Sequence, residues 1–391
     1  MRDEKTYFMN VAPNAAAGNG FVRLVLEMDG EKIVSSDANI GFSHRGIEKT
    51  LEFKNVLQSL CYFDSIRMLT PLSQEHAFVL AIEKLCGVVV PERARFIRVI
   101  MAELSRILSH LNAVAALASD LGERCSGAIV AQTSRKIASL FQKACGMPVP
   151  KAYFRPGGVK ADISKDFIAG ARDFVTRDLP EIVAEIKTLT VENRIFADRT
   201  RGIGAIDSQD ASAYGFSGVN LRATGEGFDL RKAMPYDAYA RFSFDVPVAS
   251  EGDCFARTRL RLEEVSQSGA VVLQALDGLP DGAVSVKEFS LSEKRRSLRD
   301  TSLAASAARF DFYTRGTPVG DGEVFVLTEA PFGAFGVYAV SDGKPFLYRC
   351  HIRSAGFAHL QALKIMIQNG RLEDLRPIIS SLDIQMPEVD R

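Results

Sequence analysis

The chain has 391 residues, 47% of them hydrophobic, which is enough for two or three domains or one large domain with a sizeable core. Lysine and arginine together number 48, as do aspartate and glutamate, and this balance gives no indication of a nucleic-acid or anionic-membrane partner. No stretch approaches the roughly 18 uninterrupted apolar residues that span a bilayer, so we expect no transmembrane segment and membrane association only through partners.

The six cysteines are spread along the chain, and no two of them are closer than 20 residues. Neither a CxxC pair nor histidines at ligand spacing occur, so we expect this chain to bind no metal. A reduced compartment is therefore the default interpretation. The first residues, MRDEKTYFMN, have neither the apolar core of a secretory signal nor the Arg- and Ser-rich composition of a presequence.

Residues 1–50 are expected to form a loop and β-hairpin region. The alternating pattern of Phe21–Met28 predicts a strand, and the Asp-Gly pair after it predicts a two-residue turn into a second strand, Lys32–Val34. Before the hairpin, Asn10–Gly20 consists mainly of small residues. This segment is either a simple connection or a loop whose backbone approaches a ligand closely.

A basic pair, His44 and Arg45, follows the hairpin and lies between Gly41 and Gly46. A surface turn has this composition. Two neighbouring cationic donors also suit an anion, a carboxylate or a negatively charged cluster on a neighbouring subunit.

Residues 51–200 are expected to form a central helical bundle, because apolar residues recur at helical spacing and the connections are short. The expected helices are Leu51–Thr70, Leu72–Cys86, Pro91–Leu121, Ala128–Cys145 and Lys165–Val191. Two breaks rich in glycine and proline, Gly146–Pro150 and Arg155–Gly158, interrupt the bundle, and the second places Arg155 beside a sharp bend.

The helix expected over Pro91–Leu121 carries a long apolar stripe, and we expect the rest of the chain to be organised around it. We assign Arg93 and Arg95 to its solvated face. Glu103 and Arg106 have the i,i+3 spacing of an ion pair.

Asp120 differs from the other polar residues of this helix. It lies at the C-terminal end, where the helix dipole disfavours a negative charge. We therefore expect Asp120 to have a compensating partner or a function.

Residues 201–318 are expected to be mixed helix and loop, with one long helix near residues 257–276 and a polar surface insertion at Ser290–Leu303. Residues 319–391 are expected to form an antiparallel β meander, a helix and a buried tail. The elements expected there are the strands Phe325–Thr328, Phe335–Val340 and Pro345–Ile352, the helix Phe357–Gln368 and the tail Ile384–Arg391. The predicted fold class is therefore α+β, mainly α.

Nine motifs, in collinear order, connect these elements to a known family. They are IGFSHRGIEKTLE, QEHAFVLAIEKLCG, RARFIRVIMAELSRILSHL, YFRPGGV, NRIFADRT, YGFSGVNLRATGEGFDLRKAMPYDAY, EAPFGAFGVYAVSDG, RCHIRSAGFAHL and PEVDR. This order resembles the D subunit of respiratory complex I, from about Phe8 to Arg391, which is nearly the whole chain.

The resemblance implies a helical bundle like that of the large subunit of nickel–iron hydrogenases. Those enzymes bind nickel through two CxxC motifs, and the corresponding stretches here, IGFSHRG and IQMPEVDR, contain no cysteine, which excludes a nickel site of that type. The resemblance also implies packing against an iron–sulfur subunit, whose terminal 4Fe-4S cluster reduces ubiquinone in the crevice between the two subunits. This chain itself then needs no bound cofactor.

Three residues depart from the family pattern at positions that the family uses for the quinone or the cluster. Asn19 occupies the position of a loop histidine that is a proposed proton donor to the quinone. Met68 occupies the position of a tyrosine that binds the quinone head. Pro150 occupies the position of a histidine near the cluster. Asn19 can donate a neutral hydrogen bond but no proton near neutral pH, and Met68 is only a weak acceptor.

Four other residues match the family. Asp120 corresponds to the aspartate that partners the loop histidine, His44 and Arg45 correspond to a basic pair near the cluster, and Arg155 corresponds to the arginine of the RPGG bend. In this interpretation Asp120, Asn19 and Met68 are the catalytic positions, and the others lie near the quinone or the cluster.

Two functions follow from this mixture. In the first, the chain is a core peripheral-arm subunit that forms the quinone pocket in NADH-to-quinone electron transfer coupled to proton pumping, and it is active only within the complex. In the second, it is a structural complex I subunit whose quinone ligands have been lost. Both imply other peripheral-arm and membrane-arm subunits as partners. Both imply a peripheral location on the matrix side of the mitochondrial inner membrane or on the cytoplasmic face of a bacterial inner membrane.

Overall fold

The computed structural model describes residues 6–11, 20–67, 70–286 and 302–391. The predictions made for Asn19, for Met68 and for nearly all of the insertion at Ser290–Leu303 lie outside these residues. The described chain is rich in helices and has small antiparallel sheets, which confirms the α+β, mainly α class. The division into four regions at residues 50, 200 and 318 stays a prediction.

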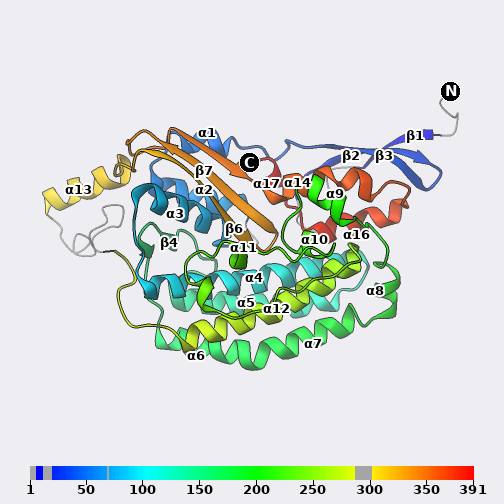
Figure 1. Cartoon of the computed structure of the whole chain (residues 1–391), viewed down its shortest axis with the longest axis horizontal. Coiled ribbons are helices and arrows are strands. Elements are labelled where there is room, and N and C mark those ends of the chain that lie inside the picture. Colours follow the sequence, from blue (N-terminus) through cyan, green and yellow to red (C-terminus); the bar gives the residue numbers. More distant parts are fainter. Residues whose placement is uncertain (1–5, 12–19, 68–69, 287–301) are drawn as a thin grey trace.

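The long helix α4 (Glu92–Asp120) is central to the helical layer (Figure 1). Pro91 precedes its first turn and Gly122 follows shortly after its end. The observed helix therefore confirms the predicted helix Pro91–Leu121. Helices α5 (Cys125–Cys145) and α12 (Cys254–Asp277) pack against it, and both confirm predicted helices. Within the described chain, α4 alone has the length and composition of a membrane span, but most of it is buried inside the protein, which is typical of a core helix.

The assignment of Arg93 and Arg95 to a solvated face is wrong. Arg93 forms an ion pair with Asp162 at 3.0 Å and donates to the carbonyl of Pro280 at 2.8 Å. Arg95 is also half-buried. Chain segments that are distant in sequence pack over the first turns of α4, which the periodicity of a single helix does not reveal.

The predicted helix Leu51–Thr70 is two helices, α1 (Ile47–Leu51) and α2 (Val56–Ile66). The division occurs at Asn55, whose side chain accepts from the backbone N–H of Gln58 in a capping box. This pairing satisfies free N–H groups of a new helix start, and it overrides the continuous apolar pattern. Helix α3 (Ser73–Cys86) follows, as predicted.

The predicted helix Lys165–Val191 is one helical path with a wide turn in it. Helix α6 (Lys165–Asp173) continues through a π-helical turn, Phe174–Asp178, into α7 (Leu179–Leu189). Pro180 lacks an N–H and crowds the carbonyl four residues before it, and a wider turn relieves that crowding.

Three antiparallel sheets complete the architecture. At the N-terminus, the predicted hairpin of β2 (Arg23–Asp29) and β3 (Lys32–Asn39) is joined by an edge strand, β1 (Thr6–Val11), which was not predicted. Few β1 side chains are buried, so the strand lacks an apolar face that a sequence pattern can reveal. The RPGG bend forms the short pair β4 (Phe154–Arg155) and β5 (Gly158–Val159).

The C-terminal meander is confirmed, with β7 (Gly333–Ser341) between β6 (Gly322–Ala330) and β8 (Arg349–Arg353). Helix α13 (Leu303–Thr314) protrudes beside it (Figure 1) and was not predicted. The remaining helices are α8 (Arg194–Asp198), α9 (Ser208–Ala213), α10 (Val219–Arg222), α11 (Leu230–Ala233), α14 (Ala355–Gln361), α15 (Leu363–Met366), α16 (Leu375–Leu382), α17 (Met386–Val389) and the 3₁₀ turns Tyr239–Arg241 and Leu372–Asp374.

Two apolar cores hold these layers together. The larger core consists of apolar side chains from α2, α3, α4, α5, α12 and the C-terminal meander. The second lies between the inner face of β2 and the C-terminal helices, where Leu24 and Leu26 pack near Ile379 and Met386. The second core therefore places the C-terminal segment of the chain beneath the N-terminal sheet (Figure 1).

Candidate functional site

The last residues of the chain, Ser380–Asp390, contact four parts of the molecule that are distant in sequence. We call these residues the C-terminal segment. Almost all of its side chains are buried. The segment begins at the end of α16, turns at Asp383 in a left-handed conformation (φ 54°), and continues through α17.

The loop Gly41–His44 holds one end of this segment. The backbone N–H groups of Gly41 and Ser43 donate to the two carboxylate oxygens of Asp390, at 2.8 and 2.7 Å. The Nδ1 of His44 is 2.6 Å from the Asp390 carbonyl, and because a carbonyl only accepts, Nδ1 carries the hydrogen. The loop is thus fixed to the chain end, and the exposed imidazole of His44 keeps its Nε2 side available.

Arg45 lies in the same loop but faces another element. Its guanidinium donates to the carbonyl of Ser65, at the end of α2, at 3.0 Å. Both members of the predicted basic pair are exposed, which fits contact with a neighbouring subunit.

Arg67 holds the middle of the C-terminal segment. This side chain is fully buried, pairs with Asp383 at 2.5 Å and Glu388 at 3.1 Å, and stacks over the ring of Phe332 at 4.2 Å. Arg67 directly precedes Met68 in the sequence, so the described flank of the predicted quinone-ligand position contacts the C-terminal segment.

Asp120 contacts the start of the segment. The hydroxyl of Ser380 donates to the half-buried Asp120 carboxylate, which is the compensating partner that its position at the helix end demands. The loop that contains Asn19 ends at Gly20, where an added Cβ atom would lie 2.8 Å from Met386 Cβ. Asp120 and the described flanks of Asn19 and Met68 therefore all meet the C-terminal segment.

Pro150 and Arg155 lie on a different element. Pro150 is buried and opens the stretch that leads into β4. The next residues are tied to α2 and α3, because the N–H of Ala152 donates to Asp64 and the N–H of Phe154 donates to Glu75, each at 2.8 Å. The carbonyl of Arg155 accepts from Arg98 on α4 at 3.0 Å. Asp64 precedes Ser65, so Arg45 and Pro150 approach the same end of α2.

A buried network of charged groups supports the site from the interior. The predicted Glu103–Arg106 pair is confirmed at 3.2 Å, but Glu103 also pairs with Arg231 at 3.2 Å and accepts from Tyr239 at 2.7 Å. Burial alone would raise the pKa of Glu103, but the charges of Arg106 and Arg231 hold it below its usual range.

The same network continues along α12. Arg222 is fully buried and binds Glu264 at 2.7 Å and Glu329 at 2.9 Å. His110 donates to Glu264 at 3.0 Å, and burial lowers the pKa of His110 to about 4, so this imidazole is neutral near pH 7. Burial would raise the pKa of Glu264, but Arg222 and the hydrogen bond from His110 bring it well below its usual range.

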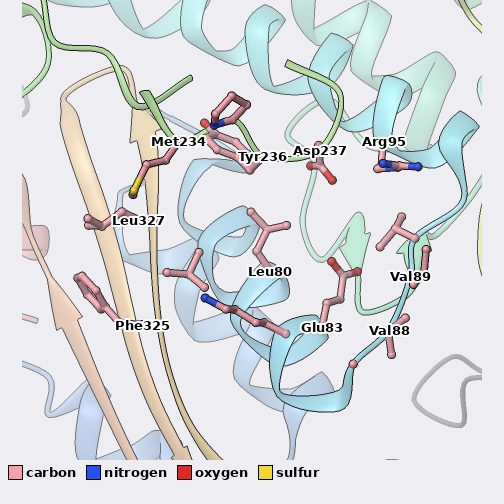
Figure 2. A pocket seen from close by; sticks show the side chains of 15 residues that line it. Leu80, Glu83, Val88, Val89, Arg95, Met234, Tyr236, Asp237, Phe325 and Leu327 are labelled. Carbon is pink, nitrogen blue, oxygen red and sulfur yellow. The ribbon is translucent and has the colours of Figure 1, made fainter. Parts of the chain in front are cut away.

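A cavity of about 700 Å3 lies between α3, β6 and residues 234–237 (Figure 2). Phe325 and Leu327 of β6 face it from one side, and Glu83 and Asp237 face it from the other. Neither carboxylate is free, because Arg98 pairs with both. Of the predicted site residues that the structure describes, none lines this cavity.

Sequence reasoning missed Arg67, Asp64 and Glu75. Glu75 carried a signal, because it shares a helix face with Phe78 and Ile82, which are both buried, and a charged residue there demands a partner. Among the described residues, no three His, Cys, Asp or Glu side chains gather as a metal site. The absence of a metal on this chain stays a prediction.

Comparisons with known proteins agree with this architecture. Residues 120–391 match the family described as the respiratory-chain NADH dehydrogenase 49 kDa subunit. The chain is 43% identical, over the full length of both proteins, to the D subunit of NADH-quinone oxidoreductase from Wolbachia sp. subsp. Brugia malayi (strain TRS). It is 42% identical to the D subunit of the same enzyme from Rhodospirillum centenum (strain ATCC 51521 / SW), with 99% of this chain and 98% of the relative covered.

Proposed function

Because the chain belongs to the family of the respiratory-chain NADH dehydrogenase 49 kDa subunit, we propose that it forms the quinone-reduction pocket of complex I together with a neighbouring iron–sulfur subunit. The chain is a core subunit of NADH-quinone oxidoreductase, and it acts as an enzyme only as part of that complex. The proposal concerns its place in the reaction.

The convergence on the C-terminal segment carries this proposal. Asp120 from the end of α4, Arg67 from the end of α2 and Gly20 from the end of the small-residue loop all contact that segment. These elements come from three separate parts of the sequence, and each bears a position that the family resemblance connects with the quinone head. Small residues in the loop permit close approach of a flat ring.

Quinone reduction requires two electrons and two protons. In our proposal the electrons come from a 4Fe-4S cluster on the neighbouring subunit, and this chain supplies shape, hydrogen bonds and protons around ubiquinone. Asn19 supplies a neutral hydrogen bond. Among the predicted site residues that the structure describes, the half-buried Asp120 and the exposed His44 are titratable side chains that contact the C-terminal segment.

Exposed aromatic side chains support a protein partner at this edge. Phe42, Phe53 and Tyr348 are 56%, 69% and 70% exposed. Phe42 lies in the loop of His44 and Arg45, and Phe53 and Tyr348 are the sequence neighbours of Glu52 and Arg349, which form an ion pair after α1. Exposed apolar groups of this size are typical of an interface with another protein. We assign the iron–sulfur subunit to this edge, and other peripheral-arm and membrane-arm subunits to the rest of the surface.

The proposal includes two further statements. The bundle of α4, α5 and α12 has the fold of the nickel–iron hydrogenase large subunit, without the nickel site. The complex is coupled to proton pumping and lies at the cytoplasmic face of a bacterial inner membrane, as the bacterial relatives favour, or at the matrix face of the mitochondrial inner membrane.

Asp120→Asn in the assembled complex tests the pocket. We expect NADH:quinone activity to fall by about 100-fold, the usual contribution of a positioned proton-transfer group, with NADH oxidation by an artificial acceptor unchanged. The control is Asp198→Asn, which removes an exposed carboxylate at the end of α8. Parent-like quinone activity in Asp120→Asn would favour the second candidate function, a structural subunit that has lost its quinone ligands.

Asn19→His is the complementary change. Residue 19 precedes Gly20, which contacts the C-terminal segment, and an imidazole at this position can deliver a proton near neutral pH, which an amide cannot. We expect quinone reduction that is faster, or less dependent on low pH, than in the parent. A pH profile of NADH:quinone activity that matches the parent's would contradict a proton-handling role of this loop.

A further inference from the structure

Two buried carboxyl groups in this protein lack a cationic partner among the residues that the structure describes. Glu75 on α3 is completely buried, and Asp64 on α2 is half-buried. Both groups accept from the same short backbone segment, Ala152–Phe154, which brings the two carboxyl groups to one place in the fold. Two ionised carboxylates in one buried site repel each other, which favours a single proton between them.

The backbone of the neighbouring segment occupies the other side of each carboxyl group. The N–H of Ala152 donates to Asp64 Oδ2 and the N–H of Phe154 donates to Glu75 Oε1, each at 2.8 Å. The remaining oxygens, Asp64 Oδ1 and Glu75 Oε2, are buried and receive no protein donor from the residues described. These two oxygens are therefore the pair available for the shared proton.

The cations near the pair face other partners. On α3, His76 binds Asp237 at 2.5 Å, and on α4, Arg98 binds Glu83. In the segment itself, the exposed Lys151 lowers the pKa of Asp64, but burial is the larger effect and raises it.

At the end of α2, Arg45 donates to the Ser65 carbonyl. In β4, Arg155 forms no salt bridge with the residues described, and its buried Nε has no partner among them. Burial and the Asp64 charge raise the pKa of Glu75 well above its usual range.

We propose that Asp64 and Glu75 hold a single proton between them, and that this shared proton fixes Ala152–Phe154 against α2 and α3. Ala152 has a φ of 47°, a left-handed conformation that is unfavourable for alanine, so contacts with other elements must stabilise it. When the proton leaves, two negative charges face each other in a buried site, and their repulsion separates the helices that hold the tie. Asp64 and Glu75 are thus positioning residues that respond to pH.

The half-buried position of Asp64 gives this proton a route to solvent. Because Glu75 is enclosed, exchange must pass through Asp64. The tied segment begins two residues after Pro150 and leads into Arg155, so its position affects the proposed quinone pocket. That link to quinone rests on the proposed function, whereas the shared proton and the tie do not.

Hydrogen exchange of the intact complex tests the tie directly. We expect the protection of the Ala152 and Phe154 amides to decrease as the pH rises and the pair loses its proton, by up to about tenfold per pH unit. In Glu75→Gln, whose amide donates at every pH, protection should stay constant. Glu75→Leu cannot accept from Phe154 and should lose protection at all pH values. Asp342→Asn, which removes an exposed carboxylate, should behave like the parent.

Infrared difference spectroscopy gives a second readout that does not depend on folding of the variants or on quinone. The parent should show the C=O stretch of a protonated carboxylic acid, which disappears at high pH and is absent from Glu75→Gln. Absence of this band in the parent, or pH-independent protection of Ala152 and Phe154, would overturn the proposal. Failure of Asp120→Asn to affect quinone reduction leaves both readouts unchanged, so the two proposals fail separately.

Discussion

Buried carboxyl groups occur in two regions of this protein, and their protonation differs. Glu103 and Glu264, on α4 and α12, face guanidinium groups, and although burial alone would raise their pKa values, Arg106, Arg231 and Arg222 hold those values low. The pair Asp64 and Glu75 binds no cation within the described chain, and burial raises both pKa values. Burial is similar for Glu75, Glu103 and Glu264, so the neighbouring charge decides the charge state.

The difference has consequences for the two regions. The network around Arg222 joins α4, α10, α12 and β6. Arg222 holds the pKa of Glu264 low, whereas burial raises the pKa of Glu329, and ion pairs and hydrogen bonds make the network a rigid frame. The acid pair joins α2, α3 and the segment before β4 through one proton. The contacts between these three elements therefore depend on pH.

The largest effect on stability is expected from removing Arg222, the cation that pairs with buried carboxyl groups of the first region. Arg222→Met leaves Glu264 and Glu329 without their main partner in a fully buried site, which should cost about 3–5 kcal/mol of folding stability. The measurements are the thermal denaturation midpoint and the yield of the assembled complex. Arg259, on α12, pairs with the exposed Glu263 instead of a buried carboxylate; Arg259→Met is the control and should assemble normally. Normal assembly of Arg222→Met would show that the network is not a frame.

A falling pH should lower the folding stability contributed by the network around Arg222, because His110 belongs to that network. The folded-state pKa of about 4 lies below the ordinary 6.5, so the unfolded chain binds more protons between these values, and stability falls as the pH falls through that window. The loss should reach about 3 kcal/mol near pH 4. His110→Gln keeps a donor for Glu264 and should lose less stability between pH 6.5 and 4, measured by thermal denaturation. His351→Gln, at a partly exposed site, should follow the parent.

A rising pH should destabilise the region of the Asp64–Glu75 pair, whereas a falling pH destabilises the network around Arg222. Glu75 has a raised pKa in the folded state, so its contribution is complete at low pH and is lost as the pH rises through the folded-state pKa. The parent should lose up to about 1.4 kcal/mol per pH unit in that range, and Glu75→Gln should not. Denaturation midpoints from pH 4.5 upward measure this difference, with the exposed Glu323→Gln as control. Identical slopes would remove the distinction between the two regions.

The smallest effect is expected at a charge pair that is not buried. Lys344 and Asp342 form an ion pair in an exposed turn between β7 and β8. Solvent screens such pairs, so Lys344→Ala should leave the denaturation midpoint and its pH dependence unchanged. A clear shift would mean that exposure is a poor guide to the strength of charge pairs in this protein.

Local patterns predicted the parts of the fold that depend on local interactions. The apolar stripes of α4 and α12, the Asp-Gly turn between β2 and β3 and the alternating strands of the meander were all recognised. The break before α2 was also present in the sequence, as the Asn55 and Gln58 capping box, but the continuous apolar pattern concealed it. Edge strand β1 buries too little to leave a pattern.

The candidate site was predictable only residue by residue. The sequence and its family motifs pointed to Asp120, His44 and Arg45, but not to what these residues contact. His44 meets Asp390 across 346 positions, and Asp120 meets Ser380 across 260. Contacts at such separations leave no periodicity in the chain, because they arise only when helices and sheets have packed.

The sequence by itself determined most of the helices, the hairpin and the meander, the family and the absence of a CxxC nickel site, because these depend on residue identity and spacing along the chain. The tertiary structure alone decided which charges are neutralised. Glu75 and Glu83 lie two turns apart on one helix face, yet Glu83 meets Arg98 and Glu75 meets Asp64. The charge state of a buried carboxyl group depends on the few atoms around it, and those atoms come from distant parts of the chain.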